Sequence, residues 1–575
     1  PPRCRRDGMM APFLDRLRRR RSTAKRAAML RLVSLALLAL LVAGAPLPAF
    51  ARQATPDAGA TATDGRPLPL EGERLVAFEA YVAEQMAAFG VPGASVAVVQ
   101  GGEVAYAQGF GVRELGRPAP VTPDTLFMVG SVTKSFTSLL AATLVDDGAL
   151  TWETPLVDLL PGFAVADPAL TERLSVADAF CACTGVPRRD LELVFGFDGL
   201  TPEAVVASIA GFPLTAPLGE AFGYSNQVYA AGGYAAAVAA GASQHDLLGG
   251  YKLALRQRVL GPIGMDRSAL TLEEVLADGD YALPHGAGLD GTVQPLSPLQ
   301  DHRFADAVAP AGVVWSSARE MAAYLQTQLA GGVAPDGAGV VSTANLARTW
   351  APRVVVDGTD GAPPVIADAA QNYGMGWVTG EYQGRPLLSH SGATLGFVSE
   401  VAFLPDDDLG LAILTNGSPG AGLFTYAVQF GLLDLLFGHD SGLDPLLASV
   451  AEAETAEREA LLADLEPVDP AAIAPFLGRY ENAAVGEVAL ALVGEEVIFN
   501  AGEVRSALWP LPDDPSSFLF ADAPLAGAPL TVELRRGDEG RPELVLDGSS
   551  TPGEGDATYV FRQVADGPPA ATPVP

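Results

Sequence analysis

The sequence predicts an α/β (α+β) fold: an antiparallel sheet flanked by helices with an inserted helical lobe, followed by a C-terminal all-β domain. Two observations predict the first part. Strand-like segments occur near residues 94–112 and again at 385–416, whereas the region between them, about 120–370, has mainly helical and loop patterns. Short strand-like runs separated by turn residues fill residues 470–565 and predict the second part. The chain has 575 residues, enough for two or three domains.

The first element, residues 1–51, has the composition of a secretory signal. A basic stretch precedes an apolar run from Leu32 to Ala45, and a small-residue cleavage site ends at Ala51. The apolar run has 14 residues, whereas a membrane-spanning helix needs about 20. We therefore expect cleavage and a secreted or extracytoplasmic protein. An uncleaved membrane anchor, which would keep the protein at the cell envelope, is the alternative.

The charge of the chain argues against one class of partner. Residues 1–51 hold 11 of the 36 basic and 2 of the 68 acidic residues, so the rest of the chain has a formal net charge of −41. A surface of that charge repels nucleic acid and anionic lipid. We expect no nucleic-acid partner, and the sequence leaves the oligomeric state open.

The number and spacing of the cysteines and histidines predict neither a metal centre nor a fold that is held together by disulfides. Beyond residue 51 the chain has two cysteines, Cys181 and Cys183. Residues two apart form a strained disulfide at best, so we expect packed free thiols. The five histidines include no His-x-x-x-His pair, and the two cysteines lack a zinc-type partner set. We expect no metal and no cofactor.

A linker and a first group of elements follow the signal segment. Residues 52–69 are polar and rich in Pro, Gly and Thr, which predicts a linker before a folded domain at 70–438. Residues 73–90 have helical periodicity, and residues 94–112 predict two strands joined by a Gly-Gly turn. Because a short connection favours antiparallel neighbours, the two strands are expected to pair.

Residues 125–140 contain the run Gly-Ser-x-x-Lys-Ser, which fits either a phosphate-binding loop or a serine nucleophile beside a lysine base. A phosphate-binding loop places one Gly directly before its Lys and a second Gly five residues before the first. Those two positions hold Thr133 and Met128. The run therefore lacks both glycines that a phosphate-binding loop needs, and we exclude that interpretation.

The serine and lysine of this run are Ser131 and Lys134, whose spacing puts both side chains on one face of the helix that the following apolar residues predict. The chain has three lysines and otherwise uses arginine for positive charge. A guanidinium is never deprotonated in proteins, whereas a buried amine can be. Lysine at position 134 therefore indicates a need for a neutral amine. Lys252 has no serine partner and is expected on a solvated face.

Two later segments carry polar groups at the ends of elements. Tyr-Ser-Asn at 224–226 directly precedes an Ala-rich helical run, and His-Ser-Gly at 390–392 closes a predicted strand. In this order after Ser131 and Lys134, they resemble the three-motif pattern of the serine β-lactamase and penicillin-binding-protein family: Ser-x-x-Lys, Tyr-x-Asn, and Lys-Thr-Gly or a variant. The resemblance covers residues 70–437 and is greatest to class C β-lactamases and the related esterases and D-amino-acid peptidases.

The resemblance implies a β-lactamase/transpeptidase-like fold and acyl transfer through a covalent acyl-enzyme. Ser131 would attack the carbonyl carbon, and Lys134 or Tyr224 would take its proton; the sequence leaves this choice open. Tyr224 would then act on the leaving group or on the attacking water. Asn226 would orient the substrate or Lys134. The backbone N–H groups of Ser131 and Ala393 would form the oxyanion hole. The implied substrate-binding residues are Asn226, His390, Ser391, Gly392 and Ala393.

Two positions depart from the family pattern. Relatives often have His-Thr-Ser where this chain has Cys-Ala-Cys at 181–183, and class C β-lactamases have Lys where this chain has His390. A histidine with an ordinary pKa near 6.5 would lose its positive charge between about pH 6 and 8. We therefore expect its help to an anionic substrate to fade across that interval, which argues against true β-lactamase activity.

The C-terminal region is predicted in three parts. Residues 439–469 have the pattern of a helical linker, residues 470–565 predict a small barrel or curled sheet of short strands, and the Pro-rich residues 566–575 form a tail. The β domain is similar to the lipocalin-like domains appended to some relatives. Because every motif lies before residue 400, we expect this domain to fold independently and to be dispensable for acyl-enzyme formation.

Together these features predict a secreted serine hydrolase that acts by acyl transfer on the amide, β-lactam or ester carbonyl of a small-molecule or peptide substrate. The alternative is a non-hydrolysing penicillin-binding sensor or receptor that remains acylated. An inactive lobe that serves only as a scaffold is disfavoured, because all three motifs are intact. Turnover of a chromogenic ester separates the enzyme from the receptor.

Overall fold

The computed structural model of the chain describes most residues from 65 to 564. The described ranges are 65–196, 200–356, 362–417, 419–502, 504–526, 530–537, 540–547 and 558–564. The predicted signal segment 1–51, residues 52–64 of the predicted linker and the tail 566–575 lie outside them. The boundaries predicted for these segments therefore stay predictions.

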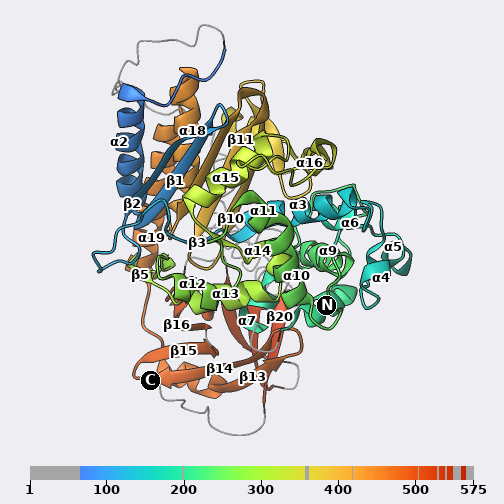
Figure 1. Cartoon of the computed structure of the whole chain (residues 1–575). Helices are drawn as coiled ribbons and strands as arrows, with labels where there is room; N and C mark the ends of the chain where they lie inside the picture. Colours follow the sequence, from blue (N-terminus) through green and yellow to red (C-terminus); the bar gives the residue numbers. More distant parts are fainter. Residues whose placement is uncertain are drawn as a thin grey trace, which may run out of the picture.

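An eight-stranded sheet joins the two ends of the first domain, in the order β2-β1-β12-β11-β10-β9-β8-β7 (Figure 1). Its strands are β1 (Gly93–Gln100), β2 (Glu103–Gly111), β7 (Val354–Val355), β8 (Asn372–Tyr373), β9 (Val378–Tyr382), β10 (Arg385–Ala393), β11 (Val398–Leu404) and β12 (Leu409–Thr415). Every pair is antiparallel, and β1 pairs with β12 in the register Val96 to Ile413. The predicted antiparallel sheet built from both ends of the domain is confirmed.

Helices cover both faces of this sheet. On one face, α2 (Gly72–Phe89) packs with α18 (Ala421–Phe437) and the start of α19 (Leu443–Asp464) in a shared apolar core. The buried residues of α2 recur at Phe78, Val82, Met86 and Phe89, one helical stripe, and the helix ends at a left-handed glycine. On the other face, α15 (Ala318–Leu329) contacts β1 and β12. With both faces covered, β1 and β12 are apolar along nearly their whole length.

The region between the two strand groups forms the predicted helical lobe. Its longest helices are α3 (Thr133–Asp146) and α9 (Asn226–Ala239), which contact each other and α14 (Ala309–Gly312). The other helices of the lobe are α4 (Leu156–Leu159), α5 (Pro168–Thr171), α6 (Val176–Ala179), α7 (Asp190–Gly196), α8 (Pro202–Ser208), α10 (Leu247–Leu255), α11 (Gly261–Ile263), α12 (Leu272–Asp278), α13 (Pro298–Asp306) and α16 (Thr343–Trp350), whereas α17 (Pro364–Ala369) packs on β9 in the core of α2 and α18. Short strand pairs β3 (Phe127–Met128) with β6 (Trp315–Ser316), and β4 (His285–Ala287) with β5 (Val293–Pro295), link the lobe to the sheet.

The C-terminal domain is a closed antiparallel barrel of eight strands that follows the long helix α19 and the short helix α20 (Pro470–Ile473). Its strands are β13 (Gly478–Asn482), β14 (Gly486–Val493), β15 (Glu496–Ala501), β16 (Val504–Leu511), β17 (Asp514–Phe520), β18 (Thr531–Arg536), β19 (Pro542–Asp547) and β20 (Thr558–Gln563). The predicted all-β domain is confirmed. Strand β16 contains Pro510, which has no N–H for the strand ladder, and the strand accommodates it beside a register shift.

The barrel is not isolated from the first domain. Leu191, Val194 and Phe195 of α7 belong to the same apolar core as the barrel interior, and the Phe195 ring lies 5.7 Å from that of Phe499. Figure 1 shows α7 at the boundary between the helical lobe and the barrel. Removal of the barrel would expose these side chains to water. The structure therefore argues against the expectation that the β domain is dispensable.

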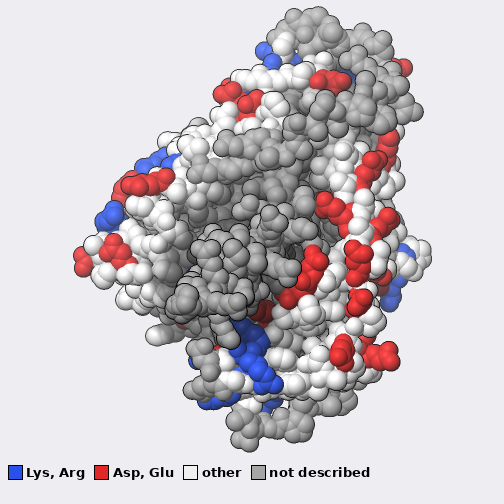
Figure 2. Space-filling model, turned by 180° about the vertical axis from the view of Figure 1, so that it is seen from behind, with Lys and Arg blue, Asp and Glu red and all other residues white. Residues whose placement is uncertain are grey.

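The surface agrees with the acidic composition. Figure 2, which shows the back of the molecule, has acidic side chains along much of the described surface and basic ones in fewer places. Among the described residues, no helix combines the length and the apolar composition that crossing a membrane would require.

Candidate active site

Ser131 lies at the start of the helical lobe, where β3 turns into α3. Gly130 adopts a φ of +51°, which a glycine tolerates, and a 3-10 turn at Gly130–Val132 then continues directly into α3. The turn places Ser131 one helical turn before Lys134, and Lys134 Nζ lies 3.0 Å from Ser131 Oγ. The predicted pairing of the two side chains on one helical face is therefore observed.

The amine of Lys134 is buried, with an exposed fraction of 1%. Besides Ser131 it contacts Asn226 Oδ1 at 2.7 Å and the carbonyl oxygen of Ala311 at 2.9 Å. Burial lowers the pKa of Lys134 well below its ordinary value, and the cation of Arg188 adds to this effect while the carboxylate of Asp190 opposes it. Lys134 can therefore be a neutral amine, and so a base, at a pH where an exposed lysine is charged.

Tyr224 lies in the loop before α9, with its ring beneath the amine of Lys134. The distance from Lys134 Nζ to the ring centroid is 4.7 Å, and the Ser131 hydroxyl is near enough to influence the ionisation of the phenol. Burial raises the pKa of Tyr224 above its ordinary value of 10, more than the neighbouring Ser131 hydroxyl lowers it. The phenol is therefore protonated at neutral pH and is placed to donate a proton beside Ser131.

The end of β10 approaches the Ser131 turn closely because glycines lie on both sides. A Cβ atom on Gly130 would be 2.9 Å from the backbone nitrogen of Ala393, and one on Gly392 would be 2.0 Å from the carbonyl oxygen of Val129. Ser399 Oγ on the neighbouring strand also donates to the Val129 carbonyl at 2.8 Å. The two backbones that carry the predicted oxyanion-hole donors are thus side by side.

His390 is buried on β10, and its two ring nitrogens are both engaged. Nδ1 lies 2.6 Å from the carbonyl oxygen of Ser391, which can only accept, and Nε2 lies 3.0 Å from the Tyr373 hydroxyl. This arrangement suits the neutral ring with its hydrogen on Nδ1. Burial, and then the charge of Lys134, lower the pKa of His390 from 6.5 to about 3. The expectation that His390 titrates between about pH 6 and 8 is therefore wrong, because it assumed a solvated imidazole.

The cysteine prediction is also wrong. Cys181 and Cys183 form a disulfide, and their Cα atoms are 5.1 Å apart, within the usual range for a disulfide. Ala182 makes this possible by adopting a left-handed φ of +50°, which turns the two side chains toward each other. The disulfide lies under the active-site loop, since the Ala182 carbonyl accepts from the Gly223 N–H at 2.7 Å. A bridge across two residues joins no distant segments, so the fold is still not disulfide-stapled.

Sequence reasoning missed several contributors to the site. Asp190 accepts two bonds from the amide of Asn226, Tyr373 contacts His390, and the Ala311 carbonyl accepts from Lys134. Asp190 and Ala311 lie in the segments CTGVPRRD and APAGVVWSS, both within the range 70–437 that the family resemblance covers. That resemblance was a signal that these segments reach the site, although the role of each residue became visible only in three dimensions.

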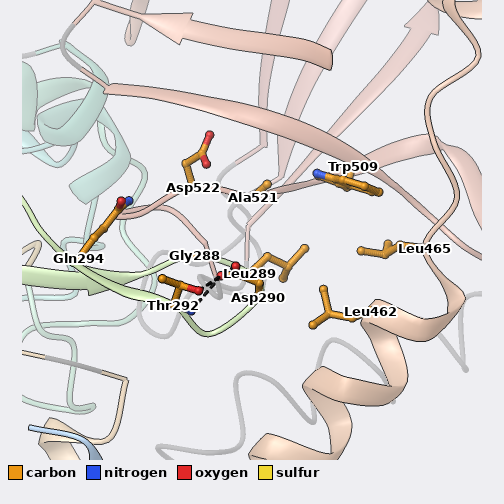
Figure 3. Close-up of a pocket in the computed structure, with 10 residues that line it drawn as sticks. All are labelled: Gly288, Leu289, Asp290, Thr292, Gln294, Leu462, Leu465, Trp509, Ala521 and Asp522. Carbon is orange, nitrogen blue, oxygen red and sulfur yellow. Dashed lines mark hydrogen bonds between the residues drawn. The ribbon is translucent and has the colours of Figure 1, made fainter. Parts of the chain in front are cut away.

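A larger pocket lies away from these residues (Figure 3). It has a volume of about 370 Å³ and is formed by the β4–β5 hairpin, the end of α19 and the barrel. Its two carboxylates are already engaged: Asp290 accepts from the backbone and the hydroxyl of Thr292, and Asp522 accepts from the Ala507 N–H. None of the predicted site residues lines it, so we place the active site at Ser131. Among the described residues, no cluster of His, Cys, Asp and Glu has the composition of a metal site.

Comparison with protein families gives one match that spans most of the first domain. The model of the family described as Beta-lactamase matches residues 78–435 of this chain. This range contains Ser131, Lys134, Tyr224, Asn226 and His390.

Two curated relatives and one solved structure extend this result. Penicillin-binding protein 4 of Amycolatopsis lactamdurans is 30% identical over 392 residues, which are 68% of this chain and 93% of the relative. The Unguisins hydrolase of Aspergillus campestris is 30% identical over 335 residues, and the chain spans only 58% of its length. The octameric penicillin-binding protein homologue from Pyrococcus abyssi has a TM-score of 0.55 at 22% identity, covering 85% of this chain and 100% of that one, which shows a shared fold.

Proposed function

The chain belongs to the Beta-lactamase family and is a serine hydrolase, and we propose that it forms a covalent acyl-enzyme on Ser131 with ester or peptide carbonyls. The observation that carries the proposal is the 3.0 Å contact between Lys134 Nζ and Ser131 Oγ inside a buried site. A serine hydroxyl is a weak nucleophile until an adjacent base removes its proton. Lys134 is the group that can do so, because Tyr224 keeps its proton.

The acylation step follows from these positions. As Ser131 Oγ forms its bond to the carbonyl carbon, its proton moves to the amine of Lys134, and the carbonyl electrons move to the oxygen. The N–H groups of Ser131 and Ala393 would stabilise that oxyanion. The tetrahedral intermediate then expels the leaving group, which takes a proton from Tyr224, and Lys134 returns its proton to Tyr224. Water repeats the sequence on the acyl-enzyme and releases the acid.

The choice of ester and peptide substrates rests on His390. In class C β-lactamases this motif position holds a lysine, a cation suited to an anionic substrate. Here it holds a neutral imidazole that is bonded to Tyr373 and to the backbone. Loss of that cation removes a charge-assisted hydrogen bond, which is worth about 1.5–3 kcal/mol. A neutral ester or an internal peptide bond needs no such partner.

We expect the ratio of kcat/KM for an anionic penicillin to that for a neutral ester to stay constant between about pH 6 and 9. His390, with its pKa lowered to about 3, is already neutral throughout this interval, and ionisation of Lys134 affects both substrates alike. His390→Lys should raise the ratio by about 10- to 100-fold, the value of one charge-assisted hydrogen bond. Parallel pH profiles support this account. A ratio that falls steeply with pH would show that His390 carries a charge.

A second candidate is a non-hydrolysing penicillin-binding receptor that is acylated and remains acylated. The relative from Amycolatopsis lactamdurans, whose name describes a penicillin-binding protein, aligns over 93% of its length and favours this candidate. Pre-steady-state kinetics separates the two. Continued turnover of an ester after the first equivalent identifies the hydrolase, whereas a single burst with no further product identifies the receptor.

We also propose that the protein acts outside the cytoplasm. The support is the basic and apolar pattern of residues 1–51, which is that of a secretory signal. Mass spectrometry of the N-terminus of the protein purified from its native cells tests this. A mature chain that begins after Ala51 is expected, and an intact segment in a cytoplasmic fraction would overturn the proposal.

A further inference from the structure

We propose that Asp190 is a positioning residue for acylation: it fixes the amide of Asn226 with its oxygen toward Lys134, and so directs the lone pair of neutral Lys134 at Ser131. The inference rests on the proposed function, because it concerns the same serine and the same base. Asp190 is the first residue of α7 and lies 36 positions before Asn226 in the chain.

The contact between Asp190 and Asn226 has a fixed polarity. Asn226 Nδ2 donates to both carboxylate oxygens of Asp190, at 3.0 Å each, and both residues are more than nine-tenths buried. An ionised carboxylate only accepts hydrogen bonds, so the part of the Asn226 amide that faces it must be the NH2 group. The amide oxygen therefore points the other way, to Lys134 Nζ at 2.7 Å.

This polarity decides where the lone pair of Lys134 lies. A neutral amine has two N–H bonds and one lone pair. Two of its three neighbours, the Asn226 amide oxygen and the Ala311 carbonyl oxygen, can only accept, so they take the two N–H bonds. The lone pair is left for the hydroxyl of Ser131, as proton removal requires. A reversed Asn226 amide would present N–H donors to Lys134 and compete with Ser131 for the lone pair.

Asp190 is itself held from two sides. Arg188 Nε donates to its carboxylate at 2.5 Å. Further along α7, Leu191 and Phe195 pack in the core of the barrel. These contacts restrict rotation of α7, which carries Asp190. The hydrogen bonds between Asp190 and Asn226 therefore also hold the Asn226 amide in one orientation.

The negative charge of Asp190 should also affect the pKa of Lys134, which a pH–activity profile can measure. The titratable and charged groups that face Lys134 are Asp190, Arg188, Tyr224, Tyr229 and His390. Both tyrosines have pKa values raised by burial and His390 has one of about 3, so these three are neutral near pH 7. Of this set, Asp190 carries the negative charge, which favours the protonated amine. Loss of that charge should lower the pKa of Lys134 further.

The first test is Asp190→Asn, which keeps the side-chain shape but removes the charge and the fixed polarity. An amide can donate or accept toward Asn226, so both orientations of Asn226 become available. We expect kcat for a neutral ester to fall about 10- to 100-fold, with KM within about twofold, as for loss of one charge-assisted hydrogen bond. The acidic limb of the kcat/KM profile should move to lower pH.

The matched control is Glu192→Gln on the same helix. The carboxylate of Glu192 accepts from the Tyr559 hydroxyl of the barrel at 3.2 Å and makes no contact with Asn226. This variant removes one charge from α7 and disturbs its contact with the barrel. It should leave kcat and the acidic limb unchanged, whereas an effect through general disturbance of α7 would appear in both variants.

A second variant exchanges the two groups, Asp190→Asn together with Asn226→Asp. The new amide at position 190 can donate to the new carboxylate at position 226, which again presents an acceptor to Lys134. We expect kcat at high pH to recover at least tenfold relative to Asp190→Asn. The acidic limb should now lie above that of the wild type, because the carboxylate touches the amine. If Asp190→Asn does not fold, the test is the position of the acidic limb of the exchanged variant relative to that of the wild type.

The outcomes separate this inference from the proposed function. If a serine-directed phosphonate does not label the wild type at Ser131, the proposed function fails. If the wild type is labelled and turns over, but Asp190→Asn has unchanged kcat and an unchanged acidic limb, only the role of Asp190 fails. A loss of activity without movement of the acidic limb, and without recovery in the exchanged variant, would reduce Asp190 to a packing residue and overturn the proposal.

Discussion

Ser131→Ala is expected to abolish ester turnover and covalent labelling by a serine-directed phosphonate. Ser131 Oγ is the hydroxyl that Lys134 Nζ contacts, at 3.0 Å, and the Ser131 turn adjoins the backbone of Ala393, the other predicted oxyanion-hole donor. Without the hydroxyl, no covalent intermediate forms, and only binding and oxyanion stabilisation remain. Loss of a serine nucleophile typically lowers kcat by roughly 10⁴- to 10⁶-fold. Intact-protein mass spectrometry measures the label directly.

Ser138→Ala is the matched control for this variant. Ser138 lies two turns further along α3, is buried, and donates to the Ser135 carbonyl at 3.1 Å. Its loss removes a hydroxyl from the same helix that is hydrogen-bonded to neither Ser131 nor Lys134 in the structure, so labelling should persist. Ser131→Ala should also keep the circular dichroism spectrum of the wild type, because Ser131 is only partly buried. Undiminished labelling of Ser131→Ala would identify another nucleophile.

The architecture could be predicted from sequence wherever a local pattern and its packing agree. Strands β1, β11 and β12 are buried on both faces and bounded by turn residues, and the structure places them where their patterns do. Local sequence patterns do not predict an element whose conformation depends on contacts with distant parts of the chain. Strand β16 contains Pro510, which the barrel tolerates only because the register shifts beside it. The two-residue strand β8 has too few residues for any periodicity to be visible.

The same distinction between local pattern and tertiary contact applies to the active site. Ser131 and Lys134 are three residues apart, so helical geometry alone brings them together. Asp190 and Asn226 meet only because the fold brings the first residues of α7 and α9 together, and no spacing rule encodes that contact. The charge state of His390 depends on its burial and on Tyr373, which a single sequence does not reveal. The disulfide depends on the left-handed backbone of Ala182, which is uncommon for a residue with a side chain.

Lys134→Arg is expected to lower kcat/KM by about 10²- to 10⁴-fold, the usual contribution of a general base. The variant keeps a positive charge in the site but cannot accept a proton, because a guanidinium stays protonated in proteins. The larger head group also has to enter a cavity where the native amine already contacts Ser131, Asn226 and Ala311 within 3.0 Å. The arginine variant therefore lacks the proton-accepting amine and also fits the cavity poorly. A second variant is needed to separate these two effects.

Lys134→Met supplies that separation, because it has nearly the length of lysine and carries neither charge nor base. If Lys134 acts by accepting a proton, both variants lose activity to a similar degree, and neither retains the rise in kcat/KM that marks deprotonation of the wild-type amine. If Lys134 acted only as a cation, the arginine variant would keep most of the activity and the methionine variant would not. Lys252→Arg is the control: Lys252 Nζ pairs with Asp306 at 2.7 Å, far along the chain from the motifs, and arginine can keep that ion pair. Both Lys134 variants leave the Asn226 amide oxygen without its lysine donor, at a cost of about 1–3 kcal/mol in stability, so thermal unfolding must confirm that each is folded at the assay temperature.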